Sequence, residues 1–223
     1  MKYRHELKYV INYSDYISVS QRLSAVARLD SHSVNGRYKI RSLYFDNDKN
    51  KALREKIDGV NYREKFRLRC YNDDYSYICL EKKSKVNGLC NKQSTRLSAS
   101  QAEALINGEY EWMKDSDDKT VFELYSKLIS QRLKPKVIVD YIREPWVYDI
   151  GNVRVTFDYD IRTALKSTDF FLPDCVTVPA CDRVMIMEVK WDELLPDVIR
   201  TAVSAADTHS SAFSKYAISR IYG

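Results

Sequence analysis

Several segments of the chain alternate charged and apolar residues, so that an arginine or lysine, often beside a glutamate, recurs at every second position. Successive side chains of a β-strand point to opposite faces of the sheet, and residues i and i+2 therefore share a face. The pattern predicts strands with one charged face and one apolar face that packs on a core. The apolar positions expected on the core face are Leu7, Leu68, Ile142, Val155 and Val189.

The charged faces resemble one another from strand to strand. They carry mostly cations, with one carboxylate nearby, at residues 4–8, 67–69, 81–85, 92, 141–143, 154–158, 188–190 and 214–215. A sheet that closes on itself would gather these faces into a polar tunnel. Such a tunnel would suit a highly charged anion together with a metal ion.

The order of the predicted elements defines the fold class. We expect strands at residues 2–11, 37–45, 62–71, 76–85, 89–97, 135–147, 152–160 and 184–191, mostly joined as hairpins. Helices are expected at 14–29, 49–57, 101–106, 120–132, 196–206 and 210–221, with Ser14 and Ser98 as N-caps, and residues 167–182 as a loop. The prediction is an α+β protein: a closed antiparallel eight-stranded β tunnel with helices packed outside.

Composition narrows this picture only slightly. The 223 residues suit one domain over 1–223, and the net charge of +5 weakly favours anionic partners. No apolar run approaches the roughly 20 residues of a membrane span and the first residues lack a signal-peptide core, so we expect a cytoplasmic protein. The five cysteines are odd in number and have no metal-binding spacing, which favours reduced thiols.

Eight motifs together resemble the VTC domain, the catalytic part of the vacuolar transporter chaperone polyphosphate polymerase, which has soluble bacterial relatives. They span nearly the whole chain in the right order, so the set is specific although each motif alone is weak. The motifs are Glu6-Leu7-Lys8-Tyr9, Ser42-Leu43-Tyr44-Phe45-Asp46-Asn47, Arg67-Leu68-Arg69, Leu80-Glu81-Lys82-Lys83, Tyr141-Ile142-Arg143, Arg154-Val155-Thr156-Phe157-Asp158, Glu188-Val189-Lys190 and Phe213-Ser214-Lys215-Tyr216.

The resemblance places the chain in the triphosphate tunnel metalloenzyme, or CYTH-like, superfamily. It implies an eight-stranded tunnel that binds a nucleoside triphosphate and a divalent metal, Mn²⁺ or Mg²⁺. In the polymerase branch, the terminal phosphate of ATP is transferred to a growing polyphosphate chain. Tunnel triphosphatases begin with an E-x-E-x-K strand, whereas this chain has Arg4 at the first carboxylate position. The replacement favours polymerase over hydrolase.

The candidate site residues combine this resemblance with phosphate chemistry. Arginine offers forked donors to phosphate oxygens, lysine acts as a point charge, and magnesium or manganese prefers oxygen ligands. The candidate catalytic residues are Lys8, Arg67, Arg69, Lys83, Arg143, Arg154 and Lys215. The candidate substrate-binding residues are Glu6, Glu81, Lys92, Tyr141, Lys190 and Ser214, and Glu188 is the candidate metal ligand.

Several of these residues have a second interpretation. Glu81 could ligate a metal or pair with Lys83 or a tunnel arginine, and Asp158 could support the metal or form a structural ion pair. Lys190 could simply neutralise Glu188, and Tyr44 could stack on a base or belong to the core. A further basic group could form an exposed helix face that contacts polyphosphate: Lys49, Lys51, Arg54 and Lys56.

Two other functions stay open at this point. An inorganic or nucleoside triphosphatase would share the fold and the metal but release phosphate. A non-catalytic sensor would bind polyphosphate or nucleotide without turnover. Nucleic acid is a poorer partner because the cations are spread over inward strand faces, and no RNA-binding motif is present.

Overall fold

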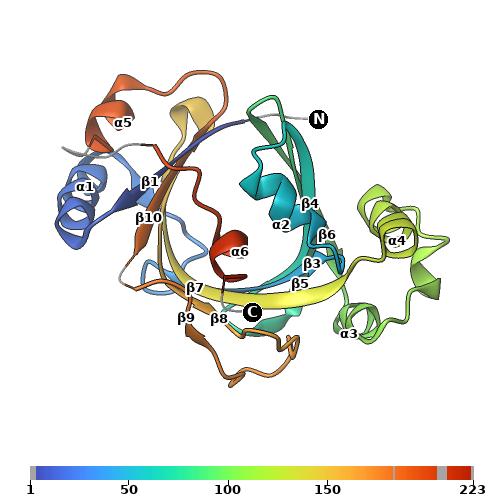
Figure 1. Cartoon of the computed structure of the whole chain (residues 1–223). Helices are drawn as coiled ribbons and strands as arrows, with labels where there is room; N and C mark the ends of the chain where they lie inside the picture. The colour runs from blue at the N-terminus through green and yellow to red at the C-terminus, as the bar shows by residue number, and fades with distance from the viewer. Residues whose placement is uncertain (1–3, 183, 205–209, 222–223) are drawn as a thin grey trace.

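The computed structural model describes residues 4–182, 184–204 and 210–221. Ten strands form one antiparallel sheet that curves into a barrel around a central space (Figure 1). The strands are β1 (His5–Ile11), β2 (Arg28–Leu29), β3 (Tyr38–Asp46), β4 (Tyr62–Tyr71), β5 (Asp74–Val86), β6 (Leu89–Leu97), β7 (Lys134–Tyr148), β8 (Val153–Thr163), β9 (Val178–Pro179) and β10 (Met185–Trp191). The helices are α1 (Tyr13–Val26), α2 (Lys51–Ile57), α3 (Ala99–Asn107), α4 (Lys119–Gln131), α5 (Asp197–Ala202) and α6 (Lys215–Ile218), with short 3-10 turns η1 (Glu111–Met113) and η2 (Ile150–Asn152).

The strand order explains how far the sheet closes. Eight strands follow the path β1-β10-β8-β7-β3-β4-β5-β6, while the two-residue strands β2 and β9 pair with β7 and β8. The ends of the path meet at one isolated bridge within the described chain, between Arg4 and Cys90. An antiparallel sheet with helices is therefore confirmed. A closed sheet of eight strands is not confirmed, because the described residues form ten strands and no continuous ladder among them joins β1 to β6.

Most predicted elements are present, and the differences have local causes. Asn12 rather than Ser14 begins α1, because its side chain and Asp15 form a reciprocal capping box. The tight β5–β6 turn fits Asn87-Gly88, whose φ angles of 48° and 87° suit a two-residue hairpin turn. The terminal helix is only α6, since Ser210 instead bridges to Tyr9 on β1. Of the predicted strand at 2–11 and helix at 196–206, residues 2–3 and 205–206 lie outside the described residues.

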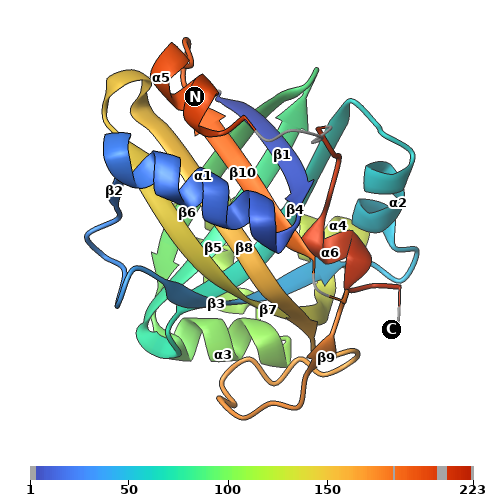
Figure 2. The same cartoon turned by 90° about the vertical axis from the view of Figure 1, so that its left-hand side faces the viewer.

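Helices cover two separate parts of the sheet's outer face. Helices α3 and α4 pack over β4, β5 and β6, and α1 and α5 pack over β8 and β10 (Figures 1 and 2). Leu68, Val155 and Val189 are buried in these clusters, as predicted. Leu7 is 37% exposed and is a wrong prediction for the core, while Ile142 is only partly buried.

The inner face of the sheet is not polar throughout. Alternation places Val137 and Val139 on the same face of β7 as Tyr141 and Arg143. The two valines join an apolar cluster that includes Ile40 and Tyr216 of α6. The apolar residues of β3, β7, β8 and α6 therefore fill part of the barrel, and the charged groups are confined to the remainder.

One buried ion pair fixes a long loop to the outer face. Arg41 of β3 is 1% exposed, and its guanidinium Nε and Nη2 donate to the Asp140 carboxylate at 2.9–3.3 Å. It also donates to the backbone carbonyls of Phe170, Leu172 and Pro173. The guanidinium thereby holds the loop between β8 and β9 against the sheet.

We predict that Asp140→Asn destabilises the fold by about 3–5 kcal/mol, because the substitution leaves the Arg41 charge buried without its counter-ion. Urea unfolding monitored by circular dichroism measures the change. Asp73→Asn is the matched control. Its pair with Lys39, at 2.8 Å, is partly exposed, so its loss should cost less than about 1 kcal/mol. Equal effects of the two substitutions would contradict the structural role of Arg41.

Candidate functional site

A polar cavity of about 400 Å³ occupies the charged part of the barrel. Among the described residues its lining includes eleven lysines and arginines but two carboxylates, Glu6 and Glu188. Every predicted site residue except Glu81 lines it: Glu6, Lys8, Arg67, Arg69, Lys83, Lys92, Tyr141, Arg143, Arg154, Glu188, Lys190, Ser214 and Lys215. The structure thus brings together side chains that lie more than 200 positions apart.

The two lining carboxylates lie on neighbouring strands and share their cations. Strands β1 and β10 pair so that Lys8 faces Glu188 and Glu6 faces Lys190. Glu6 contacts Lys83 at 2.7 Å and Lys8 at 3.0 Å, and Glu188 contacts Lys190 at 3.2 Å. Burial disfavours both charged carboxylates, but these lysines outweigh it and hold the pKa of Glu6 and Glu188 below the usual range. Both carboxylates are therefore anionic at neutral pH.

Glu81 lies behind the cavity wall and holds the basic side chains in position. Its carboxylate contacts Arg67 at 2.6 Å, Lys92 at 2.8 Å and Arg69 at 3.7 Å, and Glu81 is 2% exposed. Burial opposes ionisation of Glu81, but the arginines outweigh it and hold its pKa well below the usual range. Of the alternatives for Glu81, the geometry favours the ion pair with tunnel arginines.

Asp158 of β8 also holds basic side chains of the cavity in position. It accepts two hydrogen bonds from Arg143, at 2.6 and 2.7 Å, and contacts Lys215 at 2.5 Å. Despite complete burial, Arg143 and Lys215 lower the pKa of Asp158 to about 2. Lys215 begins α6, and the Ser214 hydroxyl oxygen accepts from the Ala217 amide. Lys215 therefore reaches the cavity from the first position of this four-residue helix, beside the buried Tyr216.

The remaining cations lie toward the rim. Arg154 pairs with Asp30, a residue of the segment before β3, and donates to the Tyr38 hydroxyl at 2.6 Å. Arg4 occupies the position at which tunnel triphosphatases carry a carboxylate, and it contacts Asp192 at 2.9 Å. Its charge is therefore directed at a carboxylate at the end of β10.

Sequence reasoning missed Lys65 and treated Tyr44 as ambiguous, yet both line the cavity. Lys65 continues the alternation of Arg67 and Arg69 along β4, and this register was the available signal. Its ammonium group lies 5.4 Å from the centre of the Tyr44 ring, and Arg67 donates to the Tyr44 hydroxyl at 2.8 Å. Burial and the neighbouring cations lower the pKa of Lys65 to about 7. Burial alone would raise the pKa of Tyr44, but Arg67 and Lys65 lower it to about 7.

The charges of the cavity do not balance. Six carboxylates contact ten of the eleven lining cations, counting the described residues: Glu6, Asp30, Glu81, Asp158, Glu188 and Asp192. Lys65 is the lining cation that contacts none of the described carboxylates. A formal excess of five positive charges is left, and it suits a ligand with several negative charges.

The chain offers a metal ion an incomplete set of ligands. Among the described residues, no group of three His, Cys, Asp or Glu side chains is placed to hold one. Magnesium, however, is commonly bound by one or two carboxylates with phosphate oxygens and water completing the shell. Glu188 and Glu6 fit that role, provided that a phosphate ligand supplies the other oxygens.

Barrel and cavity together define a polyanion-binding protein whose site lies inside a curved antiparallel sheet. The chain belongs to the VTC domain family, whose model matches residues 3–221. This confirms the family resemblance drawn from the sequence motifs. Membership of this family supports a triphosphate-binding function of the tunnel-superfamily type. The comparison with curated proteins gave no match.

Several solved structures are similar to the chain. A "putative adenylate cyclase" from Bacillus halodurans has a TM-score of 0.52 at 14% identity, with 92% of this chain and 95% of that one covered. Another so titled, from Vibrio parahaemolyticus, has a TM-score of 0.45 at 10% identity, with 90% and 82% covered. At these identities the Bacillus structure shows a shared fold and nothing of the reaction. None of the helices in the described residues is long and apolar enough to span a membrane.

We predict that Tyr44 ionises as the pH rises through about 7, whereas an ordinary tyrosine does so near 10. Tyrosinate absorption in the near ultraviolet should show one equivalent per chain in that range. Tyr44→Phe should abolish the step and Arg67→Met should move it to higher pH. Adding tripolyphosphate should also raise this pKa, because the anion offsets the cations around the phenol. A step that survives in Tyr44→Phe would assign it to another tyrosine.

Proposed function

We propose that the cavity binds ATP and that the protein transfers its terminal phosphoryl group to a growing polyphosphate chain. The observation that carries the proposal is the excess of cations over carboxylates inside the barrel. ATP carries about four negative charges at neutral pH, and burying them requires several charge-assisted contacts. The cytoplasmic location expected from the sequence stays a prediction.

Phosphoryl transfer needs accurate positioning and charge stabilisation more than covalent help from the protein. Arg67 and Arg69 point from β4 into the cavity with Glu81 behind them, and Arg143 is held in the same way by Asp158. We assign these three arginines to the phosphate oxygens. Because each guanidinium is already fixed by a buried carboxylate, little side-chain entropy is lost when phosphate binds.

We assign Lys8, Lys83, Lys92, Arg154, Lys190 and Lys215 to the same polyphosphate path, with Tyr141 and Ser214 beside it. A divalent cation, Mn²⁺ or Mg²⁺, would be held by Glu188 with Glu6 and would stabilise the charge on the transferred group. Both carboxylates are anionic at neutral pH, as metal ligation requires.

Two observations favour transfer over hydrolysis. Arg4 replaces a carboxylate and is turned to Asp192, and the described lining holds two carboxylates rather than a larger acidic cluster. The loss of one carboxylate weakens a second metal site, and two-metal sites are used to stabilise the attacking and leaving oxygens of a displacement. A triphosphatase is the second candidate, because the same arginines would also stabilise attack by water.

One assay separates the three functions. Purified protein is incubated with ATP and manganese, and the products are divided between a polyphosphate-stained gel and a phosphate-release measurement. Polymer without matching phosphate release supports the polymerase. Phosphate without polymer identifies a triphosphatase. Binding of a non-hydrolysable ATP analogue without either product identifies a sensor.

We predict that Glu188→Gln lowers turnover by about a hundredfold, the order expected when a group that stabilises transition-state charge is lost. Calorimetry with the non-hydrolysable analogue should show unchanged or tighter binding, since one negative charge leaves the cavity. Glu193→Gln, which removes an exposed carboxylate outside the cavity, is the control and should have full activity. If Glu188→Gln is fully active at ordinary manganese concentrations, Glu188 is not the ligand.

A further inference from the structure

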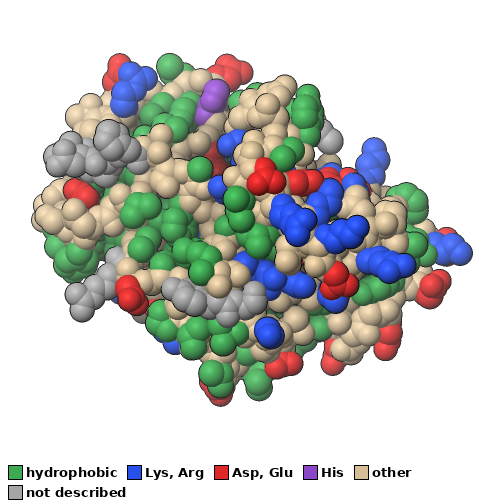
Figure 3. Space-filling model, viewed as in Figure 1, with side chains coloured by type: hydrophobic (Ala, Val, Ile, Leu, Met, Phe, Trp, Pro, Cys, Tyr) green, Lys and Arg blue, Asp and Glu red, His purple; other side chains and the backbone are tan. Residues whose placement is uncertain are grey.

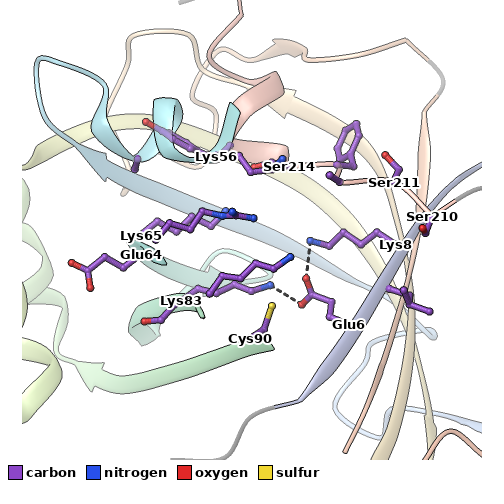
Figure 4. A pocket seen from close by; sticks show the side chains of 18 residues that line it. Glu6, Lys8, Lys56, Glu64, Lys65, Lys83, Cys90, Ser210, Ser211 and Ser214 are labelled. Atoms are coloured by element: carbon purple, nitrogen blue, oxygen red, sulfur yellow. Dashed lines mark hydrogen bonds and ion pairs between the residues drawn. The ribbon is translucent and has the colours of Figure 1, made fainter. Parts of the chain in front are cut away.

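A second cavity adjoins the first beside α2. It has a volume of about 350 Å³ and shares Glu6, Lys8, Lys65 and Lys83 with the central cavity (Figure 4). Its outer wall adds Lys56 from α2, Arg63 from β4 and Lys85 from β5. We call it the outer cavity. Because the two cavities share these side chains, an extended ligand could contact both.

Along β4 and β5, cations continue to occupy every second position beyond the central cavity. Arg63 lies two residues before Lys65 on the inner face of β4, and Lys85 lies two residues after Lys83 on β5. The two strands pair antiparallel with Arg63 opposite Lys85. Since residues i and i+2 are about 6.8 Å apart along a strand, cations follow at regular steps from the centre to the rim. A linear polyanion fits such a row better than a compact anion does.

The cations of the outer wall differ from those around them in having no counter-ion. In the described part of the chain, no carboxylate lies within ion-pair distance of Lys56, Arg63 or Lys85, and Arg63 donates to the Val60 carbonyl oxygen. Burial, Arg63, Lys8 and Lys85 lower the pKa of Lys56, which agrees with their mutual proximity. Two carboxylates, Glu6 and Glu64, line the same cavity, but among the described residues both pair with lysines other than these three cations.

Neighbouring lysines on the same side of the molecule provide an internal comparison. Figure 3 shows many lysines and arginines gathered between α2 and α4. Lys51 pairs with Glu55 at 3.1 Å, and Lys127 pairs with Glu64 at 2.7 Å. Glu64 also lines the outer cavity, but its carboxylate pairs with Lys82 and Lys127 and points away from the other labelled side chains in Figure 4. Lys51 and Lys127 are therefore paired, whereas Lys56, Arg63 and Lys85 are not. Exposed lysines such as Lys114 and Lys166 are also without a carboxylate partner among the described residues, so what distinguishes the three is that they line one cavity together.

We propose that Lys56, Arg63 and Lys85 bind the polyphosphate chain where it leaves the central cavity, with Lys65 joining the two sites. This inference rests on the proposed function, since it takes the occupant of the central cavity to be a chain of phosphates. A triphosphate held at Arg67, Arg69 and Arg143 leaves the outer wall free, whereas a longer chain contacts it. The outer cavity therefore gives affinity that depends on chain length, and it retains the polymer between additions.

The test compares tripolyphosphate with long-chain polyphosphate on the variant Lys56→Gln/Arg63→Gln/Lys85→Gln. Calorimetry should give unchanged affinity for tripolyphosphate. Affinity for long chains should fall at least about tenfold, since each partly exposed ion contact contributes about two- to fivefold. The control, Lys114→Gln/Lys119→Gln/Lys166→Gln, removes the same charge at exposed positions outside both cavities. It should bind both ligands as the parent does, and thermal unfolding shows whether both variants are folded.

The other outcomes overturn either the inference or the proposed reaction, and the measurements distinguish the two. Equal loss for both ligands would assign the three cations to the triphosphate site. An equal loss of long-chain affinity in the control variant would indicate that net charge alone is responsible. An equal loss of affinity for single-stranded RNA would indicate an unselective polyanion surface. If the parent protein binds tripolyphosphate but makes no polymer, the proposed reaction fails while the length-dependent binding is still measured. No difference between variant and parent on long chains rejects the outer site alone.

Discussion

The fold has to hold many like charges together on the inner face of one sheet. Their repulsion is strong because the barrel excludes much of the water that would screen it. Buried carboxylates offset it: Glu81 and Asp158 each bind two or more cations from positions that lining side chains cover. In the proposed function these acids would act without touching a ligand, because without them the arginines would repel one another and lose their direction.

Stability therefore has to come from elsewhere. Two apolar clusters on the outer face, beneath α3 and α4 and beneath α1 and α5, hold the strands in register from outside. The third cluster fills the part of the interior that α6 covers, and Tyr216 links it to the charged part through its contact with Tyr44. Burial of apolar area supplies the main folding free energy. The charged surface can then be kept for binding.

Much of this arrangement could be predicted from the sequence, because a period of two residues fixes both the strand and its charged face. Residues 89–97 and the Ser98 cap of α3 are found as predicted. Which face of the sheet lies inside the barrel, and which apolar residues are buried, depends on contacts with segments far away in the sequence, and the period of two does not reveal these contacts. Val139 and Val155 look alike in sequence, yet one faces inward and the other outward, and Leu7 is 37% exposed on β1, which lies at one end of the strand path. Lys65 could have been found, since it shares the register of Arg67.

The division between paired and unpaired cations follows from the competition between desolvation and affinity. A cation buried without a counter-ion destabilises the empty protein, which is why ten of the lining cations among the described residues contact a carboxylate. A cation that is already neutralised gains less from a bound phosphate than an unpaired one does. Unpaired cations are tolerable only where water still reaches them or where, as for Lys65, the proton can be released near neutral pH. The contrast between the mostly paired cations of the central cavity and the unpaired Lys56, Arg63 and Lys85 of the outer cavity therefore fits the proposed binding of a long anion.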